Sequence, residues 1–363
     1  MLLLIGYLTT PTSTTGVSLS EFWAWVRYLA AIADDDDLRL TRGFATLDGH
    51  QKTILSDDFG MGLPMLWLGD RLSFDRQLDG YYFMHRIAAS VGAVQRRSAK
   101  RGPNKTPDFV ARDTRGVWHV VECKGTQSGL DYSLRQLGSN GPPPSGGVAQ
   151  KRAIVFPARH TGQRLVCGLS IGVEGGAGTR LTIIDPEPKE PFVLRQDQLY
   201  LADDAATRGV LSKTLRLSGF EIAAEATASP LGRHPSATRY STRSAEQARE
   251  ELVSARDARA REELQNSLGR TQIFGGEFTG RELRFDLPRP ISLNGDRITR
   301  AIVRQGVNKE VLLQLQERPT IPEPIFDSQF SWTAEMGLNT AKGDERTASF
   351  QIGQVFRSEL ILE

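Results

Sequence analysis

Hydrophobic and polar positions alternate near the middle of the chain and predict a pair of antiparallel strands. In residues 107–112 and 117–124 the alternation is typical of strands that bury one face. Residues 113–116, DTRG, lie between them and supply the Asp and Gly that tight turns prefer. The pattern therefore predicts a hairpin over residues 107–124.

Apolar residues at helical spacing predict helices before this hairpin. Residues 18–33 carry apolar side chains three and four positions apart, behind a capping box formed by Ser18 and Glu21. Four consecutive aspartates at 34–37 end this helix, and we interpret them as a solvated turn rather than a metal cluster. Residues 57–90 accommodate one or two further helices.

Other segments complete the pattern of elements. Residues 128–137 follow helical spacing, and residues 244–268 predict a charged helix that begins at a capping box of Ser244 and Gln247. Strands are predicted at residues 1–8, 152–159, 164–172 and 179–185, and as short segments with one helix near 308–316 in residues 271–363.

Composition narrows the class of protein without naming a function. Hydrophobic residues make up 39% of the 363 residues, charged residues make up 24%, and the net charge is +2, so a packed core is expected and a strongly basic surface is not. The two cysteines are too few for a disulfide framework or a four-cysteine zinc site, which favours the cytoplasm. No apolar run is long enough to cross a bilayer, so no membrane partner is expected.

Three charged residues fall on one face of the predicted hairpin. Glu122 and Lys124 point the same way because side chains alternate along a strand, and Asp108 lies roughly opposite Glu122 on the partner strand. Cross-strand neighbours on one face are about 5 Å apart at Cβ. Two carboxylates at that separation repel each other unless a cation lies between them. Mg²⁺ is a hard cation that accepts such oxygen ligands.

A divalent ion beside a lysine supplies the parts that phosphodiester hydrolysis needs. The ion polarises a phosphoryl oxygen and lowers the pKa of a bound water. Lys124 can orient that water or stabilise charge on the phosphate, and the backbone carbonyl of Cys123 is a further candidate ligand. The alternative interpretation is an exposed Glu122–Lys124 ion pair on a solvated strand, which contributes little.

The dipeptide PD at 107–108, followed by ECK at 122–124 at the end of an apolar strand, resembles the PD-(D/E)xK nuclease superfamily. The resemblance covers about 100 residues, from the helical region before residue 96 to the strand at 152–159. It implies a restriction-endonuclease-like α/β fold, with a mixed central sheet flanked by helices. In that family Asp108 and Glu122 would bind Mg²⁺, for which Mn²⁺ substitutes, and Lys124 would be the catalytic lysine.

Further site residues are implied by the same resemblance. Members of the family add an acid from the first helix, for which Asp58 is the candidate and Asp57 and Asp79 are rivals. They also add a residue from the helix after the lysine strand. The candidates there are Gln136, Gln150 and Lys151, although a Pro/Gly-rich loop at 138–147 separates the first from the other two. A basic stretch before the hairpin supplies candidate DNA contacts at Arg96, Arg97, Lys100, Arg101 and Lys105.

The sequence thus predicts four parts and one leading function. The parts are an N-terminal helical segment (1–48), the nuclease core (49–190), a connector (191–243) and a helix plus β-rich accessory domain (244–363). The expected function is Mg²⁺-dependent DNA endonuclease activity in bacterial anti-phage defence or restriction, with DNA preferred over RNA because the family mostly cuts DNA. The alternative is a catalytically inactive or partner-activated subunit that binds nucleic acid in a larger defence complex. The family also allows a homodimer.

Overall fold

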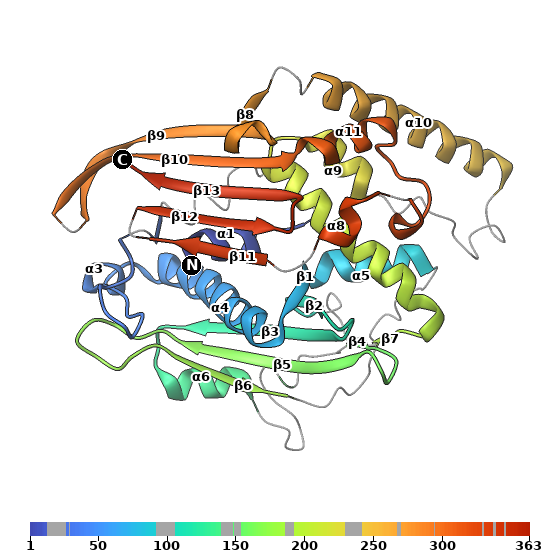
Figure 1. The fold of residues 1–363 in the computed structure, drawn as a ribbon. Coiled ribbons are helices and arrows are strands. Elements are labelled where there is room, and N and C mark those ends of the chain that lie inside the picture. Colours follow the sequence, from blue (N-terminus) through green and yellow to red (C-terminus); the bar gives the residue numbers. More distant parts are fainter. Residues whose placement is uncertain are drawn as a thin grey trace. The chain divides into compact units, whose positions relative to one another are not determined.

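The chain forms two compact units, each with its own sheet (Figure 1). The computed structural model describes residues 1–12, 27–28, 30–91, 106–138, 148, 154–185, 192–228, 242–266, 270–293, 295–328, 330–336, 339–344 and 346–363. The first unit comprises Met1–Pro11, Leu19–Met84 and Gln95–Asp197, and the second comprises Thr12–Ser18, His85–Val94 and Gln198–Glu363. The protein is therefore of mixed α/β class.

A mixed five-stranded sheet forms the centre of the first unit, in the order β1-β2-β3-β5-β6. Strands β1 (Phe74–Asp79), β2 (Phe109–Asp113) and β3 (Trp118–Thr126) are antiparallel neighbours. Strand β5 (Thr161–Ser170) runs parallel to β3, and β6 (Arg180–Ile184) returns antiparallel to β5. The predicted hairpins at 107–124 and 164–185 are both confirmed.

Helices connect these strands and cover the sheet. Helices α1 (Leu2–Thr9), α3 (Arg42–Ala45) and α4 (Gly49–Leu72) precede β1, and α5 (Gly80–Val91) follows it. Helix α6 (Leu130–Leu137) lies between β3 and β5 in the chain, within the range predicted for it. A parallel pair of strands needs such a crossover, because a tight turn can join only antiparallel neighbours.

The two faces of this sheet are covered by different helices. On one face, Gly60 of α4 lies so close to β3 that an added Cβ would be 2.5 Å from the Cα of Gly125. On the other face, an added Cβ at Gly168 of β5 would be 2.9 Å from the side chain of Leu137 in α6. Gly168 is paired with Lys124, the neighbour of Gly125, so the two contacts lie on opposite faces.

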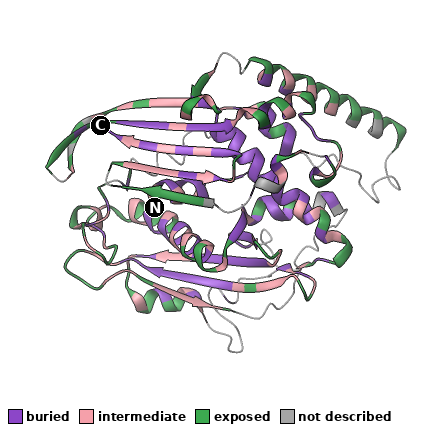
Figure 2. Ribbon diagram, viewed as in Figure 1, coloured by how far each residue is buried: buried purple, intermediate pink, exposed green. Residues whose placement is uncertain are grey.

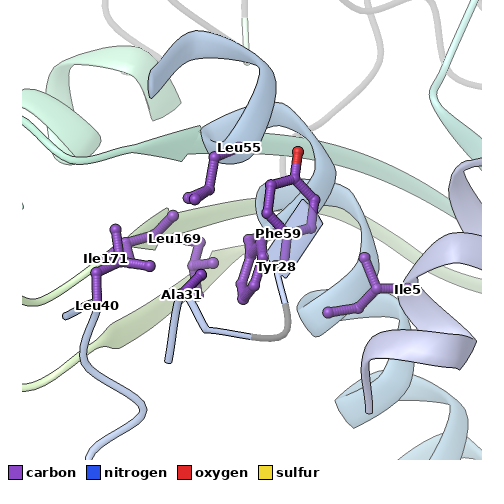
Figure 3. Packing of buried hydrophobic residues seen from close by; sticks show 8 residues of the cluster. All are labelled: Ile5, Tyr28, Ala31, Leu40, Leu55, Phe59, Leu169 and Ile171. Atoms are coloured by element: carbon purple, nitrogen blue, oxygen red, sulfur yellow. The ribbon is translucent and has the colours of Figure 1, made fainter. Parts of the chain in front are cut away.

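An apolar cluster fills the space beneath α4 (Figure 3). Tyr28 packs edge-on against Phe59 with ring centroids 5.2 Å apart, a favourable arrangement for two aromatic rings. The cluster consists of Ile5, Tyr28, Ala31, Leu40, Leu55, Phe59, Leu169 and Ile171. The buried side of α4 is thus fixed by Leu55 and Phe59, and this sets which of its polar side chains can face the end of β3.

Several sequence predictions are wrong in this unit. Residues 2–9 form a helix rather than a strand, because a short continuous apolar run fits either element. Residues 57–90 also contain strand β1, which was not predicted because its charged sequence, FDRQLD, lacks the apolar pattern of a buried strand. The Asp75 carboxylate there is neutralised by Arg112 Nη2 at 2.7 Å.

The strand predicted at 152–159 is also displaced. Among the described residues of that range, 154–159, the strand is limited to β4 (Ile154–Val155), which pairs with β7 (Phe192–Val193) in a separate two-stranded sheet. The strand next to β3 is β5, which the sequence had assigned only to a following hairpin. The helix predicted at 18–33 lies mostly outside the described residues, although Ile32 forms an isolated bridge with Leu40. The aspartates at 34–37 lie in bends and turns.

The second unit contains a six-stranded antiparallel sheet in the order β11-β12-β13-β10-β9-β8. Strands were predicted for residues 271–363, but as short segments, whereas β9 has 16 residues and β10 has 13. Its strands are β8 (Thr271–Ile273), β9 (Phe278–Leu293), β10 (Asp296–Asn308), β11 (Asn339–Gly343), β12 (Thr347–Ile352) and β13 (Phe356–Leu362). Its helices are α8 (Leu199–Leu217), α9 (Glu221–Ala228), α10 (Arg243–Gln265), α11 (Lys309–Glu317) and α12 (Trp332–Glu335). Helices α8 and α9 fall in the segment that the sequence assigned to a connector.

Burial differs sharply among these elements (Figure 2). Strand β3 is buried along most of its length, whereas α10 exposes most of its described side chains. Helix α10 begins at Arg243, so Ser244 lies inside the helix rather than at the predicted cap. Within the described part of the chain, every helix is either too short or too polar to cross a membrane.

A buried arginine connects two segments of the second unit through hydrogen bonds. Arg208 of α8 is fully buried, and its Nε donates a hydrogen bond to Asp204 at 2.9 Å. Its Nη2 donates to the carbonyl oxygens of Ile321 at 2.8 Å and Glu323 at 2.7 Å. The guanidinium therefore joins α8 to the segment that follows α11.

Candidate functional site

The register of the β2–β3 hairpin brings Asp108 to the side of Glu122. Phe109 pairs with Val121 and Val110 pairs with Val120, so the next position along places Asp108 opposite Glu122. Opposed residues of antiparallel strands point to the same face. The Oδ2 of Asp108 accepts a hydrogen bond from the backbone N–H of Cys123 at 2.7 Å. This bond fixes the Asp108 carboxylate at the end of β3, where the sequence placed it.

Glu122 and Lys124 form a short ion pair at the same strand end. Lys124 Nζ donates to Glu122 Oε1 at 2.9 Å, and Glu122 is buried. Burial alone would lower the pKa of Lys124, but the charge and hydrogen bond of Glu122, with the charge of Asp108, raise it above its ordinary value. Lys124 is therefore a cation, suited to stabilising negative charge rather than to accepting a proton. The partial burial of this pair differs from the fully solvated strand face of the alternative interpretation.

The third oxygen proposed for a metal is the carbonyl of Cys123. In an extended strand the N–H and C=O of one residue point to the same side. Since the N–H of Cys123 faces Asp108, its carbonyl is directed toward the same side of β3. Cys123 is buried and outside any disulfide, and its Sγ lies 4.0 Å from the carbonyl oxygen of Met61 in α4. It is paired in register with Cys167 of β5, which is also buried and outside any disulfide.

The structure distinguishes the three acids proposed from the preceding segment. Asp58, the first candidate, accepts a hydrogen bond from the hydroxyl of Tyr28 at 2.6 Å and so faces the apolar cluster. Asp79 accepts a hydrogen bond from the N–H of Tyr82 at the start of α5. Partial desolvation raises the pKa of Asp57, and the positive charge of Lys124 opposes that rise. Of the two neighbours Asp57 and Asp58, Asp57 is therefore the one that Lys124 influences electrostatically.

The accessory candidates are only partly within the described residues. Gln136 lies on α6, above the sheet face that carries Lys124, and its buried Oε1 has no hydrogen-bond partner among the residues that the structure describes. Gln150 and Lys151 lie outside the described residues. The same holds for all five proposed DNA contacts, Arg96, Arg97, Lys100, Arg101 and Lys105.

The oxygen atoms at this site suit a metal ion that the protein holds through only a few ligands. Among the described residues, no group of three His, Cys, Asp or Glu side chains is arranged to hold a metal ion. Asp108 and Glu122 with one carbonyl nevertheless match the way Mg²⁺ is commonly bound, through one or two carboxylates with water and substrate oxygens completing its shell. These residues therefore fit Mg²⁺ and do not form an all-protein cage.

Sequence reasoning missed two features that position this site. One is the glycine contact between Gly60 and Gly125, immediately after Lys124. The sequence GMG at 60–62 was a signal for it, because glycine within a helix often permits close packing. The other is that Asp57, rather than Asp58, lies near Lys124. This depends on the rotation of α4 about its axis, which Phe59 sets, and residue spacing alone does not determine it.

Comparison with family models, with curated proteins and with solved structures found no match to this chain.

Proposed function

We propose that this protein is a Mg²⁺-dependent nuclease that hydrolyses DNA phosphodiester bonds. The observation that carries the proposal is the convergence of Asp108, Glu122 and Lys124 at one end of the β2–β3 hairpin. Two carboxylates beside a cationic lysine at one strand end match the parts that metal-assisted phosphodiester hydrolysis needs.

The arrangement of elements supports the same proposal. Helix α4, strand β1, helix α5, the β2–β3 hairpin, helix α6, the two-residue strand β4 and strand β5, which is parallel to β3, follow one another in that order. A mixed sheet flanked by helices is what the resemblance to PD-(D/E)xK nucleases implies, with β5 in place of the strand predicted at 152–159. We therefore propose that the first unit has a restriction-endonuclease-like core.

The residues of the site have distinct roles in this proposal. Asp108 and Glu122 would hold Mg²⁺, which supplies an activated water and polarises the scissile phosphate. Lys124 would stabilise the negative charge that develops on the phosphate in the transition state. The N–H of Cys123 orients Asp108, and Asp57 lies near enough to influence Lys124. A place in bacterial defence or restriction remains part of the proposal on the basis of the resemblance.

Cleavage of plasmid DNA in the presence of Mg²⁺ tests the proposal. We expect the wild-type protein to cut and the variants Lys124→Ala and Asp108→Ala to lose at least 100-fold in rate, on the scale of losing one electrostatic contact to a transition state. Asp70→Asn is the matched control, because Asp70 is an exposed carboxylate near the other end of α4. Equal cleavage by all four proteins would reject the site.

A measurement of metal binding distinguishes the nuclease proposal from the alternative of an inactive subunit with a nuclease fold. Isothermal titration of wild-type protein with Mn²⁺ should show binding that Glu122→Gln weakens. DNA binding that persists without metal, together with no Mn²⁺ binding and no cleavage, would select the non-catalytic alternative.

A further inference from the structure

A polar hollow lies on the sheet of the second unit, outside the site described above. Its volume is about 150 Å³, and it opens on β11, β12 and β13. The residues that line it are Thr340, Lys342, Ser349, Phe350, Gln351 and Arg357. Two of these side chains are cationic, three are polar and neutral, and none is acidic.

The register explains why five of these six side chains, all except Phe350, share one face. Thr340 pairs with Gln351, which pairs with Arg357, and Lys342 pairs with Ser349 in the neighbouring row. The two rows are two residues apart along each strand, so their side chains point the same way. The hollow is thus built by sheet geometry and does not depend on a loop.

Adjacent charges on this face leave it with an excess of positive charge. Arg304 lies 2.7 Å from Glu282 and 3.3 Å from Glu359, and Arg357 Nη2 lies 3.3 Å from Glu359. Arg304 and Arg284 hydrogen-bond Glu282 and lower its pKa, so this acid is ionised. Glu282 is therefore shared by Arg304 and Arg284, and Glu359 is shared by Arg304 and Arg357. These three arginines and Lys342 carry four positive charges, against two negative charges on the glutamates.

The two cations at the hollow are held differently. Arg357 is positioned by Phe274, whose ring centroid lies 4.3 Å from the guanidinium carbon. Phe274 adopts a φ of 52°, a strained conformation for a residue other than glycine. Lys342 is exposed, and among the described residues no acidic side chain lies within ion-pair distance of it. The site thus combines an anchored guanidinium with an ammonium that can reach an anion.

We propose that this hollow binds one phosphate group of a nucleic-acid strand that lies across the sheet. Pockets that enclose a whole ligand usually measure about 300–1,000 Å³, so this smaller space suits one group of a larger molecule. Hydroxyl and amide donors beside two cations match the oxygens of a phosphate. The preference for an anion follows from the residues alone, whereas the choice of a nucleic-acid strand rests on the proposed function.

Binding of a fluorescein-labelled DNA duplex to the full chain in EDTA tests this site apart from cleavage. Lys342→Gln should weaken binding and reduce the slope of log K against log salt by about 0.9, the loss of one phosphate contact. Lys342→Arg should restore both values. Arg297→Gln, which removes an exposed charge from β10, is the matched control and should keep the wild-type slope.

Each outcome has a definite meaning. An unchanged slope in Lys342→Gln, an equal loss in Arg297→Gln, or no duplex binding by the wild type would overturn the proposal. Inorganic phosphate and a mononucleotide are the competitors that identify the source of the phosphate, and a mononucleotide that binds as tightly as the duplex would reject a strand. A duplex that is bound normally but never cut would instead refute only the nuclease proposal.

Discussion

Replacing Gly60 with alanine should separate α4 from β3 and thereby disturb the site. The new Cβ would lie 2.5 Å from the Cα of Gly125, 2.6 Å from its nitrogen and 3.1 Å from the carbonyl carbon of Lys124. Carbon atoms pack best at about 3.5–4.0 Å, so the two backbones must move apart by about 1 Å. Both sides of the contact are backbone, and no flexible side chain can yield instead.

The expected magnitude follows from two opposing effects. Overpacking a core costs about 1–3 kcal/mol. Alanine in place of glycine in a helix interior raises the free energy of unfolding by about 0.5–1 kcal/mol, because the chain loses less conformational freedom when it folds. We therefore expect Gly60→Ala to lower the free energy of unfolding by about 1–2 kcal/mol. A displacement of about 1 Å near reacting groups can reduce catalysis about 100-fold, so cleavage should suffer more than stability.

Urea denaturation and plasmid cleavage measure the two effects. Gly49→Ala is the matched control in the same helix, because an added Cβ there meets nothing within 4 Å. The control should unfold at the wild-type urea concentration or slightly above it, and it should cut normally. If Gly60→Ala matched this control in both assays, the close contact between α4 and β3 would be refuted, and with it the account of how Lys124 is held.

Three further expectations can be checked with the same methods. Arg208→Met should lower the free energy of unfolding by about 3–5 kcal/mol in urea, because it leaves the Asp204 carboxylate buried without its cation. Burial lowers the pKa of His119 below its unfolded value near 6.5, so the unfolded chain binds the proton first. Stability should then fall by up to about 1 kcal/mol as the pH drops from 6.5 to 5.5, and His119→Gln should abolish that part of the pH dependence. Asp57→Asn should slow plasmid cleavage, whereas Asp70→Asn, on the same helix, should not.

The parts of the fold that sequence predicted well are those fixed by local interactions. The β2–β3 hairpin follows from its alternation and from Asp113, whose Oδ1 accepts hydrogen bonds from the N–H groups of Arg115 and Val117. Such turn chemistry acts within five residues and needs no partner elsewhere. Once the hairpin is fixed, its register places Asp108 beside Glu122, so the centre of the candidate site could be predicted as well.

The parts that sequence missed depend on distant partners. Strand β1 is polar because Asp75 is compensated by Arg112, a residue 37 positions away that sequence spacing cannot assign to it. Residues 2–9 are apolar on every side, so their secondary structure is decided by packing against α4 rather than by periodicity. The same limit applies to Asp57 and Asp58, since adjacent helical residues face different directions and only the buried side of α4 decides between them.

The geometry at the end of β3 links the stability of the first unit to its proposed chemistry. Lys124 and Gly125 are consecutive, so the lysine faces the α6 side while the glycine receives α4 on the other. A side chain at Gly125 would place its Cβ 1.8 Å from the carbonyl oxygen of Ser56, which a packed helix cannot accommodate. Residue 125 must therefore stay without a side chain for α4 to pack against β3 next to Lys124. Because residues 124 and 125 are consecutive, a displacement of β3 away from α4 would also move the backbone that carries Lys124.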